Sequence, residues 1–187
     1  MKKITFTLIL TLAFMIHGSN LYAQKSYSSG GYGHTLNLGL GIGGYSGYYH
    51  YSGHSLPVFS INYEFNVARN FTLAPFALFS SYRDYYKDGS RKYYYRQTII
   101  PIGVKGTYYF DQILGASSAW DFYLAGSLGF VIAKSSWDDG HAYDTYYSDV
   151  SPLFLDLHIG TEYHVSKKVG LFLDLSTGVS TIGLAIH

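Results

Sequence analysis

Apolar and small residues alternate without a break between Thr35 and Tyr45. One face of this segment carries Leu36, Leu38, Leu40 and Ile42, and the other carries Asn37, Gly39, Gly41 and Gly43. Because side chains along a β-strand alternate with a period of two, the segment is predicted to be a strand. Its second face is small and uncharged, so we expect that face to line a crowded interior, where Phe154 and Phe172 find room. The leucines are then expected to face lipid.

Seven further segments carry related patterns, which gives eight predicted strands. Six of them run over about Pro57–Asn66, Phe71–Tyr82, Tyr93–Phe110, Trp120–Ala133, Val169–Ser176 and Ser180–His187. The remaining strand, the sixth in chain order, begins at Leu153 and alternates as far as Gly160. The phase of the third strand stays open, because Phe76, Leu78 and Phe79 put bulk on both faces. Pro101 lies well inside the fourth strand, so we expect a bulge or a missing hydrogen bond there.

The connections between these strands alternate in length. Short turns are expected at Asn66–Asn70, Asp111–Ala119 and Ser166–Lys168, and long polar loops at Arg83–Lys92 and Ser135–Asp149. Aromatic residues gather at the short-turn end, where Tyr63, Phe65, Tyr108–Phe110, Tyr163, Phe71, Trp120 and Phe122 are expected to form a girdle. An even number of strands with this asymmetry is typical of barrels of the outer membrane.

The composition and the N-terminus agree with a membrane location. Charged residues make up 13% of the chain, about half of the ~25% usual in soluble domains. Residues 1–23, with Lys2, Lys3 and the apolar run Ile4–Ile16, are predicted to be a Sec signal peptide, because the run is shorter than the ~20 residues of a membrane helix. Residues 24–34 are expected to be a flexible periplasmic segment. Residues 35–187 are expected to be an all-β, membrane-spanning, up-and-down antiparallel barrel of eight strands in the outer membrane.

Two segments resemble those of a known group of proteins. Ile100–Lys105 leading to Tyr108–Phe110, and Gly170–Asp174 before a glycine-containing last hairpin, resemble the small outer-membrane β-barrel proteins of Gram-negative bacteria. The likeness is to the OmpX and OmpA transmembrane-domain type and to the "outer membrane protein beta-barrel domain" family. It implies a monomer in contact with lipid, lipopolysaccharide and the barrel-insertion machinery, but no particular activity. Such barrels usually end on an aromatic residue, whereas this sequence ends on His187. Three alternatives stay open: the natural end has lost the aromatic residue, the sequence stops one residue early, or His187 takes its place.

Charged residues on the inward face are the first candidates for a site. They are Glu64, Lys105, Asp121, Asp156, His158, Glu162 and Asp174, with His164 beside them. Buried charges must be paired, so we expect a plug of salt bridges and hydrogen bonds. The alternative is a narrow ion or small-solute pathway that passes His158 and His164. Asp156, His158, Glu162 and His164 also suggest a metal site, but residues two apart on a strand are separated by ~6.6 Å, so no metal and no cofactor is expected.

The outer loops are the second candidates. Tyr48, Tyr49, Tyr85, Tyr86, Arg91, Lys92 and Tyr146 are expected to contact a ligand of unknown identity, or in part to form an outer girdle. Residues Arg83–Arg96 hold five basic and two acidic residues, a net charge of +3 that suits lipopolysaccharide phosphates. The chain has no strong overall charge for nucleic acid, and no nucleophile motif surrounds His50, His54 or His141. We therefore predict a non-enzymatic barrel with a structural or surface-interaction role, such as adhesion.

Overall fold

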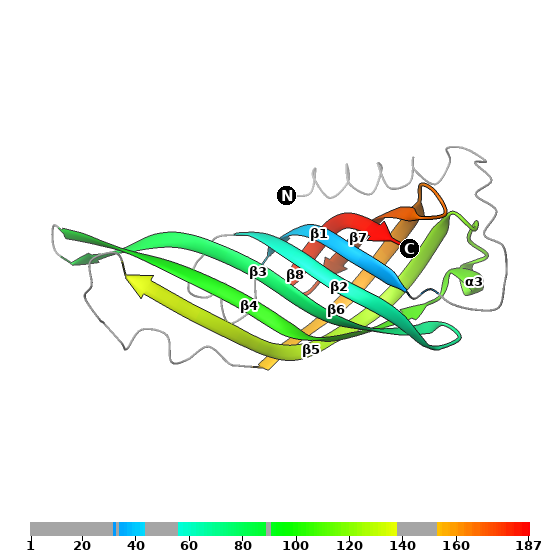
Figure 1. Cartoon of the computed structure of the whole chain (residues 1–187), viewed down its shortest axis with the longest axis horizontal. Helices are drawn as coiled ribbons and strands as arrows, with labels where there is room; N and C mark the ends of the chain where they lie inside the picture. Colours follow the sequence, from blue (N-terminus) through cyan, green and yellow to red (C-terminus); the bar gives the residue numbers. More distant parts are fainter. Residues whose placement is uncertain (1–31, 33, 44–55, 89–90, 138–152) are drawn as a thin grey trace, which may run out of the picture.

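Eight antiparallel strands form a closed barrel in a computed structural model, which describes residues 32, 34–43, 56–88, 91–137 and 153–187 (Figure 1). The strands are β1 (Thr35–Gly43), β2 (Leu56–Ala68), β3 (Phe71–Asp88), β4 (Arg91–Tyr109), β5 (Trp120–Trp137), β6 (Leu153–His164), β7 (Val169–Ser176) and β8 (Val179–Ile186). Each strand pairs with the next, and β8 pairs with β1 to close the sheet. The predicted fold is confirmed.

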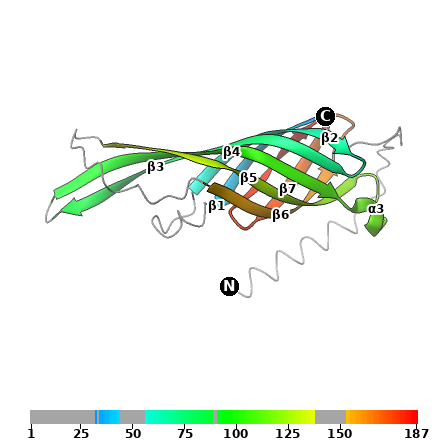
Figure 2. The ribbon, with the colours of Figure 1, turned by 90° about the horizontal axis from the view of Figure 1, so that it is seen from below.

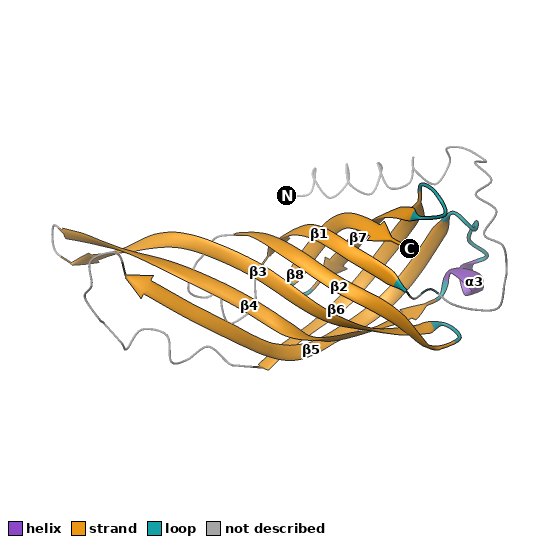
Figure 3. Ribbon diagram, viewed as in Figure 1, coloured by secondary structure: helices purple, strands orange, loops and turns teal. Residues whose placement is uncertain are grey.

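A single helical turn, α3 (Asp111–Leu114), interrupts the β4–β5 connection (Figure 3). It ends at Gly115, whose φ of 60° lies in the left-handed region that glycine adopts most readily. None of the helical segments in the described ranges has the length and hydropathy needed to cross a bilayer. The predicted signal peptide and the segments 44–55 and 138–152 lie outside the described residues.

The two faces of the sheet differ sharply in chemistry, as the alternation predicted. On β6, Leu153, Leu155, Leu157 and Ile159 are exposed on the outside, whereas Phe154, Asp156 and Glu162 are buried inside. The open phase of the third strand is now fixed, because Thr72, Ala74 and Ser80 are buried and Pro75 and Phe79 are exposed. Tyr109, which was expected in the girdle, points into the barrel and is 4% exposed, because it has the opposite parity to Tyr108.

Glycine pairs make room for the interior aromatic rings. Gly39 lies opposite Gly183, and a Cβ placed on Gly39 would lie 3.0 Å from the ring tip of Phe172, as expected. Gly103 lies opposite Gly129, and Phe76 and Phe154 flank this second pair in the register. The rings of Phe76 and Phe154 are 5.5 Å apart, so Phe154 takes its space beside β4 and β5.

Prolines interrupt two of the ladders. The β3–β4 pairing stops between Ala77↔Ile102 and Ser80↔Ile99, where Pro101 has no N–H to donate. This is the missing pairing expected for Pro101. The β2–β3 pairing has a similar gap at Pro75, between Asn62↔Phe76 and Phe65↔Leu73.

The β3–β4 hairpin is much longer than predicted. The expected loop Arg83–Lys92 is wrong, because residues 71–88 and 91–109 are strand and pair as far as Asp88↔Arg91. Tyrosine favours strands, and cross-strand pairing stabilises a polar sequence that by itself looks like a loop. β5 likewise continues to Trp137 rather than ending at Ala133. A membrane strand needs about 9–11 residues, so these strands extend well past the rest of the barrel (Figures 1 and 2).

Candidate functional site

The barrel has two ends of different construction. The terminal mouth is the end formed by Thr35, Tyr109, Trp120, His164 and Ile186, where the connections are short. The hairpin end is the opposite one, from which β3, β4 and β5 project (Figure 2). Between them the inward side chains form several polar clusters.

The central cluster is built around Asp174 of β7. Lys105 of β4 donates to Asp174 Oδ2 at 2.5 Å, and the Tyr123 hydroxyl of β5 donates to the same oxygen at 3.0 Å. His158 Nδ1 lies 2.7 Å from Asp174 Oδ1. Asp174 and Lys105 are 3% and 8% exposed, so this carboxylate is buried but paired, and it joins four strands across the lumen.

Ser127, His158 and Asp174 form a chain that matches the order of groups in a serine hydrolase. Ser127 Oγ is 2.8 Å from His158 Nε2, and His158 Nδ1 in turn contacts Asp174. The adjoining cavity has a volume of about 40 Å³, room for only a few water molecules. Ser127 is 3% exposed, so an acyl substrate has no room beside it. These two hydrogen bonds therefore stabilise the packing of β5, β6 and β7 against one another.

Glu64 of β2 is the centre of a second cluster, nearer the terminal mouth. It accepts hydrogen bonds from Asn37 Nδ2 (3.0 Å), Thr72 Oγ1 (2.9 Å) and the Tyr109 hydroxyl (2.6 Å). These three donors come from β1, β3 and β4. Glu64 therefore links the first four strands through hydrogen bonds. None of these three donors carries a charge.

Tyr32 covers the Glu64 cluster from the terminal mouth. Its ring stacks on Tyr109 with centroids 4.0 Å apart, and Tyr109 meets Tyr123 edge to face. The Tyr32 hydroxyl donates to Asp111 of α3 at 2.9 Å. Burial and the neighbouring Asp111 carboxylate raise the pKa of this hydroxyl above its usual value, so it stays neutral at ordinary pH. Tyr32 thus lies across the mouth.

Asp156 serves the β7–β8 turn and contacts the central cluster only weakly. It accepts hydrogen bonds from the Ser176 and Thr177 hydroxyls and from the Gly178 and Val179 backbone amides. Its distance to His158 Nε2 is 3.8 Å. Asp156 is 1% exposed and holds the turn in place.

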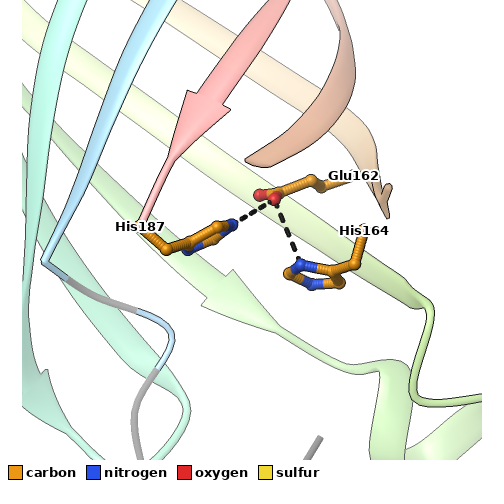
Figure 4. A group of neighbouring side chains, drawn as sticks. All are labelled: Glu162, His164 and His187. Carbon is orange, nitrogen blue, oxygen red and sulfur yellow. Dashed lines mark hydrogen bonds and ion pairs between the residues drawn. The ribbon is translucent and has the colours of Figure 1, made fainter. Parts of the chain in front are cut away.

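Two histidines flank Glu162 at the terminal mouth (Figure 4). His187 Nε2 is 2.7 Å from Glu162 Oε1, and His164 Nδ1 is 3.5 Å from the same oxygen. His164 Nε2 also contacts Asp121 Oδ2 at 2.8 Å. The sequence pattern grouped Glu162 and His164 with Asp156 and His158 along one strand, but in the structure their additional neighbour is His187, directly after β8. The parity of β8 could have found it, since Ile186 faces out and residue 187 therefore faces in.

The outer candidates are only partly within the described residues. Tyr48, Tyr49 and Tyr146 lie outside them, and the backbones of Tyr86, Arg91 and Lys92 are strand but their side chains are not described. Tyr85 is exposed on the hairpin and its ring centroid is 5.9 Å from that of Tyr94. Arg83 lies over the Tyr94 ring at 4.9 Å, so the outward face of the hairpin carries a cation–π contact and an aromatic pair.

The outside of the barrel is a continuous apolar surface. Exposed large side chains include Leu40, Ile42, Phe59, Ile61, Val104, Leu128, Phe130, Leu155, Leu157, Ile182 and Leu184. Aromatic rings border it at the terminal mouth, where Trp120 packs 4.9 Å from Tyr163 and 6.1 Å from Phe122. Apolar outside and charged inside is the reverse of a soluble barrel and suits a closed sheet in lipid. These features define a small eight-stranded β-barrel of the outer-membrane type.

Comparisons with known proteins found similar solved structures but no similar sequence family. No protein-family model matches the chain, and no curated sequence matches it. A de novo designed transmembrane β-barrel is 12% identical with a TM-score of 0.45, over 84% of this chain and 98% of that one. Neisserial surface protein A is 20% identical with a TM-score of 0.44, over 81% and 94%. The attachment invasion locus protein Ail of Yersinia pestis, solved with the heparin analogue sucrose octasulfate, is 7% identical with a TM-score of 0.39, over 81% and 92%. The class therefore rests on this chain's own topology and surface.

Proposed function

We propose that this protein is an integral outer-membrane barrel that acts by surface contact through its β3–β4 hairpin, without catalysing a reaction. The observation that carries the proposal is the length of that hairpin. β3 and β4 have 18 and 19 residues, roughly eight more than a membrane crossing of about 9–11 residues needs. At ~3.3 Å a residue, the excess extends about 25 Å beyond the apolar belt.

The register of the hairpin supports an anionic ligand. Arg83 lies directly opposite Arg96, and Lys87 opposite Lys92. This register places two cross-strand pairs of basic residues along the hairpin, and such a concentration of positive charge suits an anionic ligand. Arginine and tyrosine together suit phosphate or sulfate groups on sugars, because the guanidinium pairs with the anion and the ring packs on the sugar. Lipopolysaccharide and extracellular glycans both offer this chemistry.

The closed interior argues against the alternative of a narrow pathway. Lys105, Tyr123 and His158 converge on Asp174 in mid-lumen, and Phe76 and Phe154 pack toward the hairpin end. A conducting path would have to break these contacts. In planar bilayers we expect no steady conductance from the purified chain. Steady single-channel steps that change in a K105M variant would instead favour the pathway.

The proposal is tested by replacing the hairpin while keeping the barrel. A variant in which residues 83–96 are replaced by Asn-Gly should still fold, as shown by a mobility difference between boiled and unboiled samples on a gel. It should lose retention on heparin–agarose, used as a polyanionic probe at physiological salt. An R83Q/R96Q variant should elute at lower salt than wild type, whereas K167Q/K168Q, which removes two lysines at the terminal mouth, should not. Equal retention of the hairpin-less variant and wild type would refute the proposal.

A further inference from the structure

We propose that Glu162, His164 and His187 form a binding site for one divalent transition-metal ion, best suited to Zn²⁺, at the terminal mouth. The inference is independent of the surface role proposed above, because the cluster lies at the end opposite the hairpin. The three residues come from the end of β6 and from the position after β8. They are brought together because β7 pairs with both strands, so that Gly170 lies opposite His164 on one side and Ala185 on the other.

The donor atoms are already close to a metal-binding geometry. One atom from each residue lies within 4.8 Å of the others. Glu162 Oε1 is 2.7 Å from His187 Nε2 and 3.5 Å from His164 Nδ1. In a tetrahedral Zn²⁺ site with bonds of about 2.0–2.1 Å, neighbouring donors are about 3.3 Å apart. Small side-chain rotations would therefore suffice to reach an ion placed among them.

Each histidine is oriented by a second contact on its other ring nitrogen. His164 Nε2 pairs with Asp121 Oδ2 at 2.8 Å, which leaves Nδ1 directed to Glu162. His187 Nδ1 pairs with Thr35 Oγ1 at 3.0 Å, which leaves Nε2 directed to Glu162. Asp121 and Thr35 are 4% and 2% exposed, so both orienting groups are fixed. Histidine ligands of metals are typically held in this way, by a carboxylate or another polar group on the far nitrogen.

Gly170 of β7, which pairs with His164, leaves room for the Glu162 carboxylate. A Cβ placed on Gly170 would overlap Glu162 Oε1 and Cδ, so only glycine at this position lets Glu162 lie where it does. Glu162 is buried, whereas the His187 side chain is 23% exposed at the mouth. An ion can therefore arrive from the aqueous side and find a carboxylate already in place.

The ligand set points to the class of ion. Two imidazole nitrogens and one carboxylate suit Zn²⁺ and its neighbours in the first transition row, whereas Ca²⁺ and Mg²⁺ prefer oxygen ligands alone. Three protein ligands leave a fourth position open to water or to a group supplied from outside. Without an ion the same residues can only pair as imidazole and carboxylate.

Binding is tested on the full chain folded in detergent and stripped with EDTA, by calorimetric titration with ZnCl₂ alone. We expect one ion per barrel, with affinity falling at least tenfold in H187Q, H164Q and E162Q. D121A should weaken binding about 10- to 100-fold, because it removes the orienting contact and leaves all three ligands in place. G170A keeps every ligand but displaces Glu162, and it should weaken binding to a similar extent. Co²⁺ on the wild-type chain should give the visible bands of a tetrahedral site, independently of any variant.

The control is His34, an exposed histidine at the same mouth that contacts Tyr63 rather than the cluster. H34Q should bind Zn²⁺ as wild type does, and boiled and unboiled gel samples should show that every variant is folded. The proposal is overturned if wild type takes up no Zn²⁺, if the folded H164Q/H187Q double variant binds as tightly as wild type, or if H34Q weakens binding as much as H187Q. The last two results would place the ion elsewhere on the chain.

Discussion

At the scale of single residues, Lys105 and Asp174 offer a test of the interior network. In D174L, Lys105 loses its carboxylate inside the barrel and Tyr123 and His158 lose an acceptor. We expect a loss of about 3–5 kcal/mol in the free energy of unfolding, because an uncompensated charge remains buried. K105M should lower the free energy of unfolding by less, since Tyr123 and His158 still donate to Asp174.

Urea unfolding in lipid vesicles measures both losses. The control is S127A, which removes one hydrogen bond and should lower the free energy of unfolding by about 0.5–1.5 kcal/mol. Equal losses in K105M and D174L would contradict this account.

The inward residues themselves could be predicted from parity, but their partners could not. Alternation places Glu64, Asp121, Asp156, Glu162 and Asp174 on the interior face, and each is buried in the structure. Which of them meet depends on the stagger between strands, which is fixed only when the sheet closes. Thus Asp156 accepts hydrogen bonds from the β7–β8 turn, whereas Asp174 forms an ion pair with Lys105 of β4. For His187, the parity of β8 predicts the inward direction, whereas its contact with Glu162 depends on the register of β7 with β6 and β8.

At the scale of strands and hairpins, the facing glycines of β4 and β5 set how closely the two backbones approach. A Cβ on Gly129 would overlap the Ile102 carbonyl and the backbone of Gly103. We therefore expect G129A to lower the free energy of unfolding by about 1–3 kcal/mol, as overpacking does. G126A on the same strand is the matched control, because its Cβ would have 3.9 Å to the nearest atom, on Leu157. Urea unfolding of both variants measures this difference. An unchanged free energy of unfolding in G129A would show that β4 and β5 can move apart without loss of stability.

The existence and phase of the strands follow from the sequence better than their ends do. Apolar residues at every second position identify a strand wherever lipid lies on one side, as on β1 and β6. Beyond the bilayer this contrast vanishes, because both faces of the hairpin meet water. Arg83–Lys92 then shows only tyrosines and charges, and its strand character comes from pairing across the hairpin. The predicted third strand therefore ends at Tyr82, near the edge of the apolar surface, whereas β3 continues to Asp88.

For the molecule as a whole, the strand lengths and connections imply a single orientation in the membrane. Tyr85 lies on the projecting hairpin, and Lys167 lies in the short β6–β7 turn at the terminal mouth. Outer-membrane barrels place long connections outside the cell and short turns in the periplasm. The hairpin should therefore be reachable from outside and the terminal mouth, with its histidines, from the periplasm.

Single cysteines can test this orientation, because the chain has none of its own. In a Gram-negative host, a membrane-impermeant maleimide should label Y85C in intact cells and should reach K167C only after the outer membrane is permeabilised. Both positions are exposed side chains, so reactivity after permeabilisation should be similar and serves as the internal control. Labelling of K167C but not Y85C in intact cells would invert the orientation. The hairpin would then face the periplasm, and the proposed surface role would fail, while Glu162, His164 and His187 would open to the medium.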